Sequence, residues 1–329
     1  MNLDYLSGRS ILVTGGTGSF GQRCINILLE KSAARRIIVF SRDELKQSQM
    51  ATTFADQKDR LRFFLGDVRD LARLNRAFNG VDIVIHAAAL KQVPSLEYNP
   101  SEAIQTNIIG TQNVVNAAID QDVEKVMLIS TDKAANPANL YGATKLCAER
   151  LCISSNFYTG GETKLSAVRY GNVLGSRGSL LKLVEEQRKT GVVLLTHEEM
   201  TRFWITLDQG VELVLSSLKR MKGGEIYIPK IPSMRVSDLL RVLAPECEMK
   251  VIGIRPGEKL HEVLITPEEA RHTVELEDVH VIFPEFSFGK DLISHLNGKS
   301  LEDGFAFTSD KNTKWLDEEG LKQLLESIK

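Results

Sequence analysis

SILVTGGTGSFG, residues 10–21, sets the architecture expected for this chain. Its first five residues are an apolar run with the length of a strand, and an apolar pattern of helical period follows the last glycine. A glycine loop between a strand and a helix is typical of a dinucleotide-binding site, because the backbone can approach a pyrophosphate that faces the helix N-terminus. A tight turn with incidental glycines is the alternative. The candidate phosphate-contacting residues are Gly15, Thr17, Gly18, Ser19, Phe20 and Gly21.

The alternation of strand and helix continues downstream. Further strands are expected at residues 37–40, 62–65, 81–85, 126–130 and 165–169, with a helix at 104–119. No hairpin signal separates these units, so the sequence predicts an α/β fold with a Rossmann-type doubly wound parallel sheet and a smaller C-terminal substrate-binding domain. Cofactors in such sheets lie across the carboxyl ends of the strands.

The tip of the second strand is where the adenosine ribose of a dinucleotide is recognised. Ser41 and Arg42 precede the acidic Asp43 there, and Lys46 follows one helical turn after Arg42. Hydroxyl and cationic groups can bind a 2′-phosphate, so we expect NADP rather than NAD. An Arg42–Asp43 surface pair, with Asp43 capping the next helix, is the alternative.

Residues after the third and fourth strands complete the expected cofactor groove. Asp67 follows a buried strand, where it can face the adenine amino group, although a turn-capping role is also open. Ala87, Ala88 and Ala89 leave room for a ligand to lie against the backbone, and Lys91 stands just beyond them. We expect His86 to be a packed strand-end residue. The cofactor candidates from these two strands are Asp67, Val68, Ala87, Ala88, Ala89 and Lys91.

The stretch STDKAANPANLYGATK, residues 130–145, follows the fifth strand and carries reactive side chains. Tyr141 and Lys145 are four residues apart on one helix, so they project from the same face. A nearby ammonium favours the phenolate and brings the tyrosine toward the range of a useful base. Tyr141 and Lys145 are therefore candidates for both catalysis and cofactor binding.

TGGTGSFG, STDKA, YGATK and RYGNV together resemble the extended short-chain dehydrogenase/reductase superfamily. More narrowly, SRDELKQ, GDVRDL, HAAALK, STDKAANP, RYGNVLGSRGS, MTRFWI and IRPGEKLHE are similar to the soluble, short form of the inverting UDP-N-acetylglucosamine 4,6-dehydratases. The similarity runs from about Gly8 to about Pro284. It implies an NADP-dependent lyase that makes the first intermediate of pseudaminic acid, a sugar placed on flagellin and other bacterial surface glycans.

The resemblance implies a role for each reactive side chain. Tyr141 would take the proton of the 4-hydroxyl while hydride passes from carbon 4 to NADP, and Thr131 would hydrogen-bond the 4-oxygen. Lys133 would be the base at carbon 5 and Asp132 the acid for the departing 6-hydroxyl, with reprotonation from the opposite face inverting carbon 5. An Asp132–Lys133 ion pair that merely closes a loop is the alternative.

The second half is expected to hold the UDP-sugar. Lys91, Asn172, Val173, Arg177, Thr196, Met200, Arg202, Arg255 and Glu258 are the candidate substrate-binding residues, most of them implied by the resemblance. Residues 1–171, with a returning helix within 201–222, would form the NADP-binding domain. Residues 172–200 and 223–285 would form the substrate-binding domain, and residues 286–329 a C-terminal tail on the outside or in subunit contacts.

Composition excludes several classes of function. A net charge of −2 over 329 residues gives no basic field that would attract nucleic acid. The N-terminal residues lack the pattern of a secretory signal, and no apolar run is long enough to cross a bilayer. Four scattered cysteines show no metal-ligand spacing and are typical of a reduced protein. We expect a cytoplasmic, metal-free homo-oligomer, from dimer to hexamer. The alternatives to the dehydratase function are a UDP-N-acetylglucosamine 4-epimerase and a non-catalytic NADP sensor.

Overall fold

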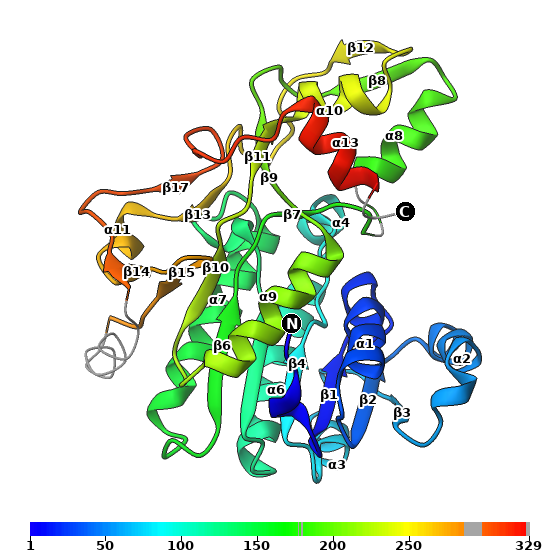
Figure 1. The fold of residues 1–329 in the computed structure, drawn as a ribbon, viewed down its shortest axis with the longest axis vertical. Helices are drawn as coiled ribbons and strands as arrows, with labels where there is room; N and C mark the ends of the chain where they lie inside the picture. The colour runs from blue at the N-terminus through cyan, green and yellow to red at the C-terminus, as the bar shows by residue number, and fades with distance from the viewer. Residues whose placement is uncertain (177, 179, 286–297, 327–329) are drawn as a thin grey trace.

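A large twisted sheet forms the centre of the molecule (Figure 1). The computed structural model describes residues 1–176, 178, 180–285 and 298–326. Within the sheet, six parallel strands have the order β3-β2-β1-β4-β5-β6, which is that of a Rossmann fold. This confirms the predicted doubly wound parallel sheet. The strands are β1 (Ser10–Thr14), β2 (Arg36–Ser41), β3 (Leu61–Leu65), β4 (Ile83–His86), β5 (Lys125–Ile129) and β6 (Lys164–Val168).

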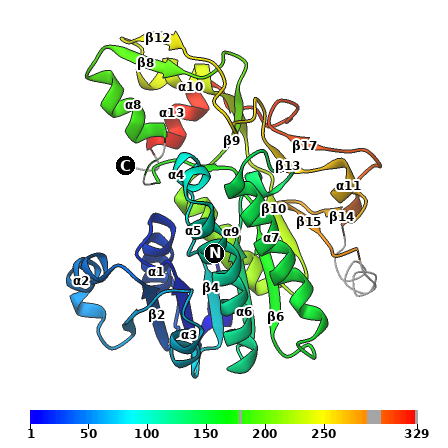
Figure 2. The same cartoon turned by 180° about the vertical axis from the view of Figure 1, so that it is seen from behind.

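Helices cover both faces of this sheet (Figure 1 and Figure 2). Helices α3 (Leu71–Phe78), α6 (Gly110–Asp120) and α7 (Leu140–Ser154) pack beside one another on one face, and α1 (Ser19–Lys31) and α9 (Leu207–Arg220) pack together on the other. Helix α9 also contacts β5 and β6, as expected for a helix that returns to the first domain. Its N-terminus is fixed by a capping box between Thr206 and Gln209. The remaining helices here are α2 (Glu44–Thr53), α4 (Val93–Tyr98) and α5 (Pro100–Ala103).

The sheet continues beyond β6 with strands from the second half of the chain. β10 (Ile226–Pro229) pairs with β6 in parallel, and three antiparallel strands follow it. The sequence assigned residues 223–285 to the smaller domain, but these strands belong to the large sheet. The apolar β10 is fully buried there, because it covers the edge that β6 would otherwise expose. The three are β15 (Val279–Ile282), β14 (Thr273–Glu275) and β16 (Lys299–Ser300).

A smaller unit stands above the carboxyl ends of the parallel strands (Figure 1). It has its own apolar core, in which Val184, Val193 and Leu240 are almost fully buried. Its elements are α8 (Leu180–Arg188), β8 (Val192–Leu195), α10 (Val236–Leu243), β12 (Glu248–Val251) and α13 (Glu318–Glu326). A three-stranded sheet of β7 (Asn172–Val173), β9 (Thr201–Ile205) and β11 (Ser233–Arg235) connects it to the large sheet.

The described C-terminal segment, residues 298–326, is mostly exposed, but it packs into the fold at Phe307, Ser309 and Leu321. β17 (Phe307–Thr308) pairs with β13 (Val263–Ile265), just after the short turn that ends the smaller unit. Ser309 is fully buried, and Leu321 of α13 is buried against α10. The described part of the expected outer tail therefore lies largely on the surface, with Phe307 and Leu321 each contributing to an apolar core. Helix α11 (Pro267–Ala270) follows β13.

Candidate active site

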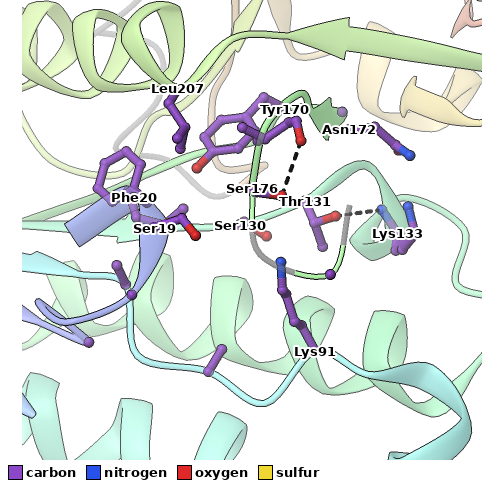
Figure 3. Close-up of a pocket in the computed structure, with 18 of the residues that line it drawn as sticks. Ser19, Phe20, Lys91, Ser130, Thr131, Lys133, Tyr170, Asn172, Ser176 and Leu207 are labelled. Carbon is purple, nitrogen blue, oxygen red and sulfur yellow. Dashed lines mark hydrogen bonds between the residues drawn. The ribbon is translucent and has the colours of Figure 1, made fainter. Parts of the chain in front are cut away.

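A cavity of about 470 Å³ lies between the carboxyl ends of the parallel strands and the smaller unit. Its wall is made by the glycine loop after β1, the loops after β4 and β5, the first turns of α7, and the segment after β6. The loop after β4 brings Lys91 toward the cavity, opposite Lys133 and Thr131 (Figure 3). Tyr141 and Lys145 line the same space. The structure thus brings the predicted catalytic stretch and the predicted glycine loop into one cavity.

A second cavity of about 190 Å³ adjoins the glycine loop on the side of β2 and β3. Both cavities share Gly15, Gly18, Ala87 and Ala89 in their walls, so together they form an extended groove across the strand ends. At the outer end of this groove, the positively charged Arg42 lies beside the negatively charged Asp67. The predicted adenosine-binding residues that line this cavity are Thr17, Ser41, Arg42, Asp67, Val68 and Ala88.

The glycine loop has the close packing that a dinucleotide cradle requires. Gly15 has φ of +64°, and a Cβ atom there would lie 2.8 Å from the Ala88 backbone nitrogen. At Gly21 a Cβ atom would lie 2.5 Å from the Gly16 Cα atom, so this glycine lets α1 approach the loop. The loop backbone and the N-terminus of α1 therefore lie at the wall of the larger cavity, and a helix N-terminus favours an anion there. These residues fit a bound dinucleotide.

The ribose end of the groove contains both cations and their carboxylate partners. The hydroxyl oxygens of Thr17 and Ser41 are 2.7 Å apart. Arg42 Nη1 lies 3.6 Å from Asp67 Oδ2, and the arginine side chain is half exposed. The side chains of Lys46 and Asp43 form an ion pair. Asp43 also caps α2 by accepting a hydrogen bond from the Lys46 backbone N–H, which is the capping role that the sequence left open. Cations that can be shared with a 2′-phosphate are present, although each also has an acidic neighbour.

Tyr141 and Lys145 are placed by the N-terminus of α7. Asn139 caps this helix by accepting a hydrogen bond from the Gly142 backbone N–H at 2.8 Å. Lys145 is buried and donates to the Ile129 carbonyl at 2.7 Å. Burial lowers the pKa of Lys145 to about 8, although Glu149 opposes that shift. Two groups that the sequence predicted to share a face do so.

The phenol of Tyr141 is not activated in the way that the sequence predicted. Burial raises the pKa of Tyr141 to about 12, and the nearby Asp132 adds to the increase. The cation that opposes this increase is Lys133 rather than Lys145, with help from a hydrogen bond to Thr131. Burial outweighs both, so in the protein alone Tyr141 keeps its proton at neutral pH.

Thr131, Asp132 and Lys133 form a compact cluster at the cavity wall. Asp132 is fully buried and its Oδ1 accepts from the Thr131 hydroxyl at 2.8 Å and from Lys133 Nζ at 3.0 Å. The Lys133 side chain is 26% exposed, so it can reach a ligand in the cavity. Burial raises the pKa of Asp132, while the two carboxylates beside Lys133 raise its pKa despite burial. A carboxyl group and an amine that exchange a proton are thus available side by side.

Glu262 completes this cluster, and sequence reasoning missed it. Its side chain is 3% exposed, and its Oε1 lies 3.4 Å from Lys133 Nζ. Arg202 and Lys259 approach the same carboxylate at 3.6 Å and 4.0 Å. Burial opposes ionisation, but these three cations hold the pKa of Glu262 below its usual range. The available signal was the final glutamate of IRPGEKLHE, which contributed to the resemblance without receiving a role.

A buried hydrogen-bond chain holds the loops of the cavity in place. Thr14 donates its hydroxyl to His86 Nδ1 at 2.7 Å, and His86 Nε2 donates to Thr111 Oγ1 at 3.0 Å, because Thr111 itself donates to the Asn107 carbonyl. Asn107 then bonds both the Leu90 backbone and the Thr144 hydroxyl. His86 is a packed strand-end residue, as predicted. Its pKa is lowered to about 3 by burial and by Lys145.

Asn107 lies in a helical segment that departs from the expected regular helix at residues 104–119. Residues Ile104–Ile109 form a π-helical turn, and α6 begins at Gly110. Such a turn adds one residue to the helical repeat and is frequent at functional sites. Here it aims the Asn107 side chain at the loop after β4.

The expected substrate-binding residues separate into two groups. Lys91, Asn172 and Val173 line the larger cavity, and Asn172 Oδ1 is buried without a hydrogen-bond partner in the described part of the chain. Arg177 lies outside the described residues. The other five do not line either cavity as described: Thr196 and Met200 are buried in the smaller unit, Arg255 is exposed, Glu258 is partly buried, and Arg202 is buried.

Arg202, one of the predicted substrate-binding residues, makes its contacts within the fold. Its guanidinium donates to the backbone carbonyls of Thr201, Lys259 and Leu260, and it lies beside Glu262. The wall of the larger cavity also contains residues outside the predicted substrate-binding set. These include Gln92, Ser130, Tyr170, Leu174, Trp204 and Leu207.

Metal-binding clusters and membrane-spanning helices are both absent from the described residues. No group of three or more His, Cys, Asp or Glu side chains there could hold a metal ion. No helix in the same ranges has both the length and the apolar character needed to span a membrane.

Comparison with known proteins gives matches over nearly the whole chain. The family described as polysaccharide biosynthesis protein matches residues 11–284. The UDP-N-acetylglucosamine 4,6-dehydratase (inverting) of Campylobacter jejuni is 49% identical over 331 residues, covering 97% of each chain. The UDP-glucose 4-epimerase of Rickettsia conorii is 40% identical over 96% of this chain and 95% of its own. The X-ray structure of Pen from Bacillus thuringiensis superposes with a TM-score of 0.90 at 37% identity, covering 98% of both chains.

Proposed function

This chain belongs to the polysaccharide biosynthesis protein family, within the extended short-chain dehydrogenase/reductase superfamily, and we propose that it is an NADP-dependent UDP-N-acetylglucosamine 4,6-dehydratase that inverts carbon 5. The observation that carries the proposal is the Lys133–Asp132 pair, 3.0 Å apart: Lys133 lines the same cavity as Tyr141, and the buried Asp132 lies directly behind it. A reductase that only moves hydride has no need for a buried acid–base pair at this position.

The first step removes hydrogen from carbon 4 of the sugar. Tyr141 accepts the 4-hydroxyl proton, and Thr131, which hydrogen-bonds Tyr141, can hold the same oxygen. A bound nicotinamide supplies the hydride acceptor, and its positive charge opposes the raised pKa of Tyr141. Lys145, fixed to the Ile129 carbonyl, is placed one helical turn from Tyr141, where it can hold the nicotinamide ribose.

The second step eliminates water, and the Lys133–Asp132 pair can supply both of the groups it needs. Transfer of one proton from the Lys133 ammonium to the Asp132 carboxylate gives a neutral amine and a carboxylic acid. The raised pKa of Asp132 favours this transfer, because burial disfavours its charged form, whereas the raised pKa of Lys133 opposes it. The amine then takes the carbon 5 proton, and the acid gives its proton to the departing 6-hydroxyl. Water leaves, and the original ammonium and carboxylate are restored. Return of the hydride from the bound nicotinamide to carbon 6, with a proton added to carbon 5 from the opposite face, would then give the 4-keto-6-deoxy sugar inverted at carbon 5.

The preference for NADP over NAD rests on the ribose end of the groove. Ser41 and Arg42 line the adenosine cavity, and Lys46 stands one turn along α2. Asp43 is engaged as the cap of α2 and as the partner of Lys46, so it is not free to select a ribose 2′-hydroxyl. We propose Gly15, Gly18, Ser19 and Phe20 as contacts of the pyrophosphate and nicotinamide halves, since all four line the larger cavity.

A 4-epimerase is a second candidate, because a curated UDP-glucose 4-epimerase is 40% identical. An epimerase uses the hydride step alone and leaves the 6-hydroxyl in place. Incubation of the purified protein with NADP and UDP-N-acetylglucosamine, followed by mass spectrometry, separates the two. A product lighter by one water supports the dehydratase, and a product of unchanged mass supports the epimerase.

The proposal extends to the setting of the reaction. The product would be a UDP-2-acetamido-2,6-dideoxy-β-L-arabino-4-hexulose, the first intermediate toward pseudaminic acid and a surface glycan such as that on flagellin. We also propose that the chain acts in the cytoplasm as a homo-oligomer, between a dimer and a hexamer. Light scattering coupled to size-exclusion chromatography measures that assembly directly, and a monomer would contradict it.

A further inference from the structure

We propose that Glu262 is a positioning residue for the elimination: its buried carboxylate holds Lys133 beside Asp132 and sets the pH range in which this pair works. The inference rests on the proposed dehydratase function. Glu262 lies 129 residues from Lys133 along the chain, and the fold brings its Oε1 to 3.4 Å from Lys133 Nζ. Because Glu262 does not line the described cavities, it acts through Lys133 rather than on the sugar.

Glu262 is presented by a short segment that straps the smaller unit to the catalytic loop. We call residues 257–262 the strap. At its start, Asn139 donates to the Gly257 carbonyl at 2.8 Å, and in its middle Lys259 donates to the Ala135 carbonyl at 2.7 Å. At its end stands the Glu262 contact with Lys133. Three successive contacts thus fix the strap to the loop that carries the acid–base pair.

The backbone of Glu262 is also fixed from the other side. Its N–H donates to the buried Ser309 hydroxyl at 2.9 Å, and its carbonyl accepts from the Ser309 N–H at 2.9 Å. Ser309 follows directly after β17, which pairs with β13. Arg202 holds the Lys259 and Leu260 carbonyls as well. The carboxylate therefore cannot follow Lys133 freely, and it defines where the ammonium rests.

The charges around Lys133 show what Glu262 contributes. The charged or titratable groups that face Lys133 are Asp132 on its own turn, Tyr141 on α7, Lys91 after β4, Arg202 on β9, and Lys259 and Glu262 on the strap. Three of these are cations. Without Glu262, Asp132 would be the one carboxylate facing Lys133 and the three other cations. The positive charge of the Lys133 ammonium would then be incompletely neutralised in a buried site.

The direction of the pH effect follows from these contacts. Glu262 raises the pKa of both Asp132 and Lys133, because a negative charge favours the protonated form of each. The active form of the pair carries one proton, shared between Asp132 and Lys133. Activity is therefore lost at low pH when Asp132 takes up a second proton, and at high pH when Lys133 loses the first. Removing the Glu262 charge lowers both values. The whole pH–rate profile must then move toward lower pH.

The test compares Glu262→Gln with wild type in steady-state dehydration of UDP-N-acetylglucosamine across pH. We expect both limbs to move down by about one pH unit or more. We also expect kcat at the optimum to fall about 10- to 100-fold, because Lys133 is misplaced, while KM stays within about threefold. Glu268→Gln, an exposed position six residues further on, is the matched control and leaves the profile unchanged.

Other outcomes overturn the inference. A Glu262→Gln profile with wild-type limbs, whatever its kcat, assigns the carboxylate a purely structural role as the partner of Arg202. If Glu262→Gln does not fold, Glu262→Asp replaces it, since the shorter side chain withdraws the charge from Lys133. An unshifted profile in that variant overturns the proposal equally. Failure of wild type to release water would instead contradict the proposed function itself.

Discussion

Arg169 Nη2 lies 2.7 Å from Glu149 Oε2, and the two side chains are at most 1% exposed. Arg169 follows β6, and Glu149 lies on α7 one turn after Lys145, which we propose to be catalytic. The guanidinium also pairs with Glu269 at 2.8 Å and donates to the Leu264 carbonyl. This buried network therefore joins the catalytic helix to the segment that follows the strap.

Removal of Arg169 should be strongly destabilising. The substitution Arg169→Met leaves Glu149 and Glu269 buried without their cation, and breaking a buried pair in this way typically costs about 3–5 kcal/mol. The free energy of unfolding in urea measures the loss. Arg271→Met is the control, because its partner Asp303 is 81% exposed and such surface pairs contribute about 1 kcal/mol or less. Equal losses in the two variants would contradict the assignment.

Lys145 should leave a signature in the pH dependence of stability. Its pKa is lowered to about 8 in the folded chain, below the unfolded value of 10.5. The unfolded state therefore binds more protons between these values, so this group makes stability rise with pH, by at most about 1.4 kcal/mol per pH unit. Lys145→Met should remove that part of the slope between pH 8 and 10. Urea titrations over this pH range measure the slope, with the exposed Lys189→Met as the control. If stability changes with pH equally in Lys145→Met and wild type, the pKa of Lys145 is not lowered in the folded chain.

Local sequence patterns were sufficient for the first half of the fold. Short apolar runs and glycine turns predicted β1 to β6 in order, because each pattern and its structural element occupy the same few residues. The returning helix was predicted within residues 201–222 for the same reason, and α9 lies inside that range. Tyr141 and Lys145 were found because their four-residue spacing is itself the geometry of a helix face.

Long-range contacts were beyond the same reasoning. β10 reads as an isolated apolar strand, and nothing in its own residues says that it pairs with β6 rather than within the smaller unit. The contacts of Arg202 depend on carbonyls almost sixty residues away, so the sequence, read through the resemblance, suggested only a substrate-binding role. Glu262 was missed because its partner Lys133 lies in a different half of the chain.

Two glycines with similar backbones should respond differently to the same substitution. Gly8 and Gly15 have φ of +73° and +64°, but a Cβ atom at Gly8 meets nothing within 4 Å, whereas at Gly15 it meets the Ala88 nitrogen at 2.8 Å. Gly8→Ala should cost about 1–2 kcal/mol through backbone strain alone. Gly15→Ala should cost more and should abolish dinucleotide binding, measured by calorimetry with NADP. Wild-type affinity in Gly15→Ala would remove this loop from the proposed cofactor site.

Lys133→Met should separate the two steps of the proposed reaction. The methionine keeps the length of the side chain but removes the base, and Tyr141 and Lys145 remain in place to support oxidation at carbon 4. We therefore expect normal NADP affinity, reduction of the nicotinamide on addition of UDP-N-acetylglucosamine, and no incorporation of solvent deuterium at carbon 5. Tyr141→Phe is the matched comparison, because it should block oxidation as well and leave the nicotinamide absorbance unchanged. Deuterium incorporation by Lys133→Met at the wild-type rate would show that another group removes the carbon 5 proton, and the ion pair would then be no more than the closure of a loop.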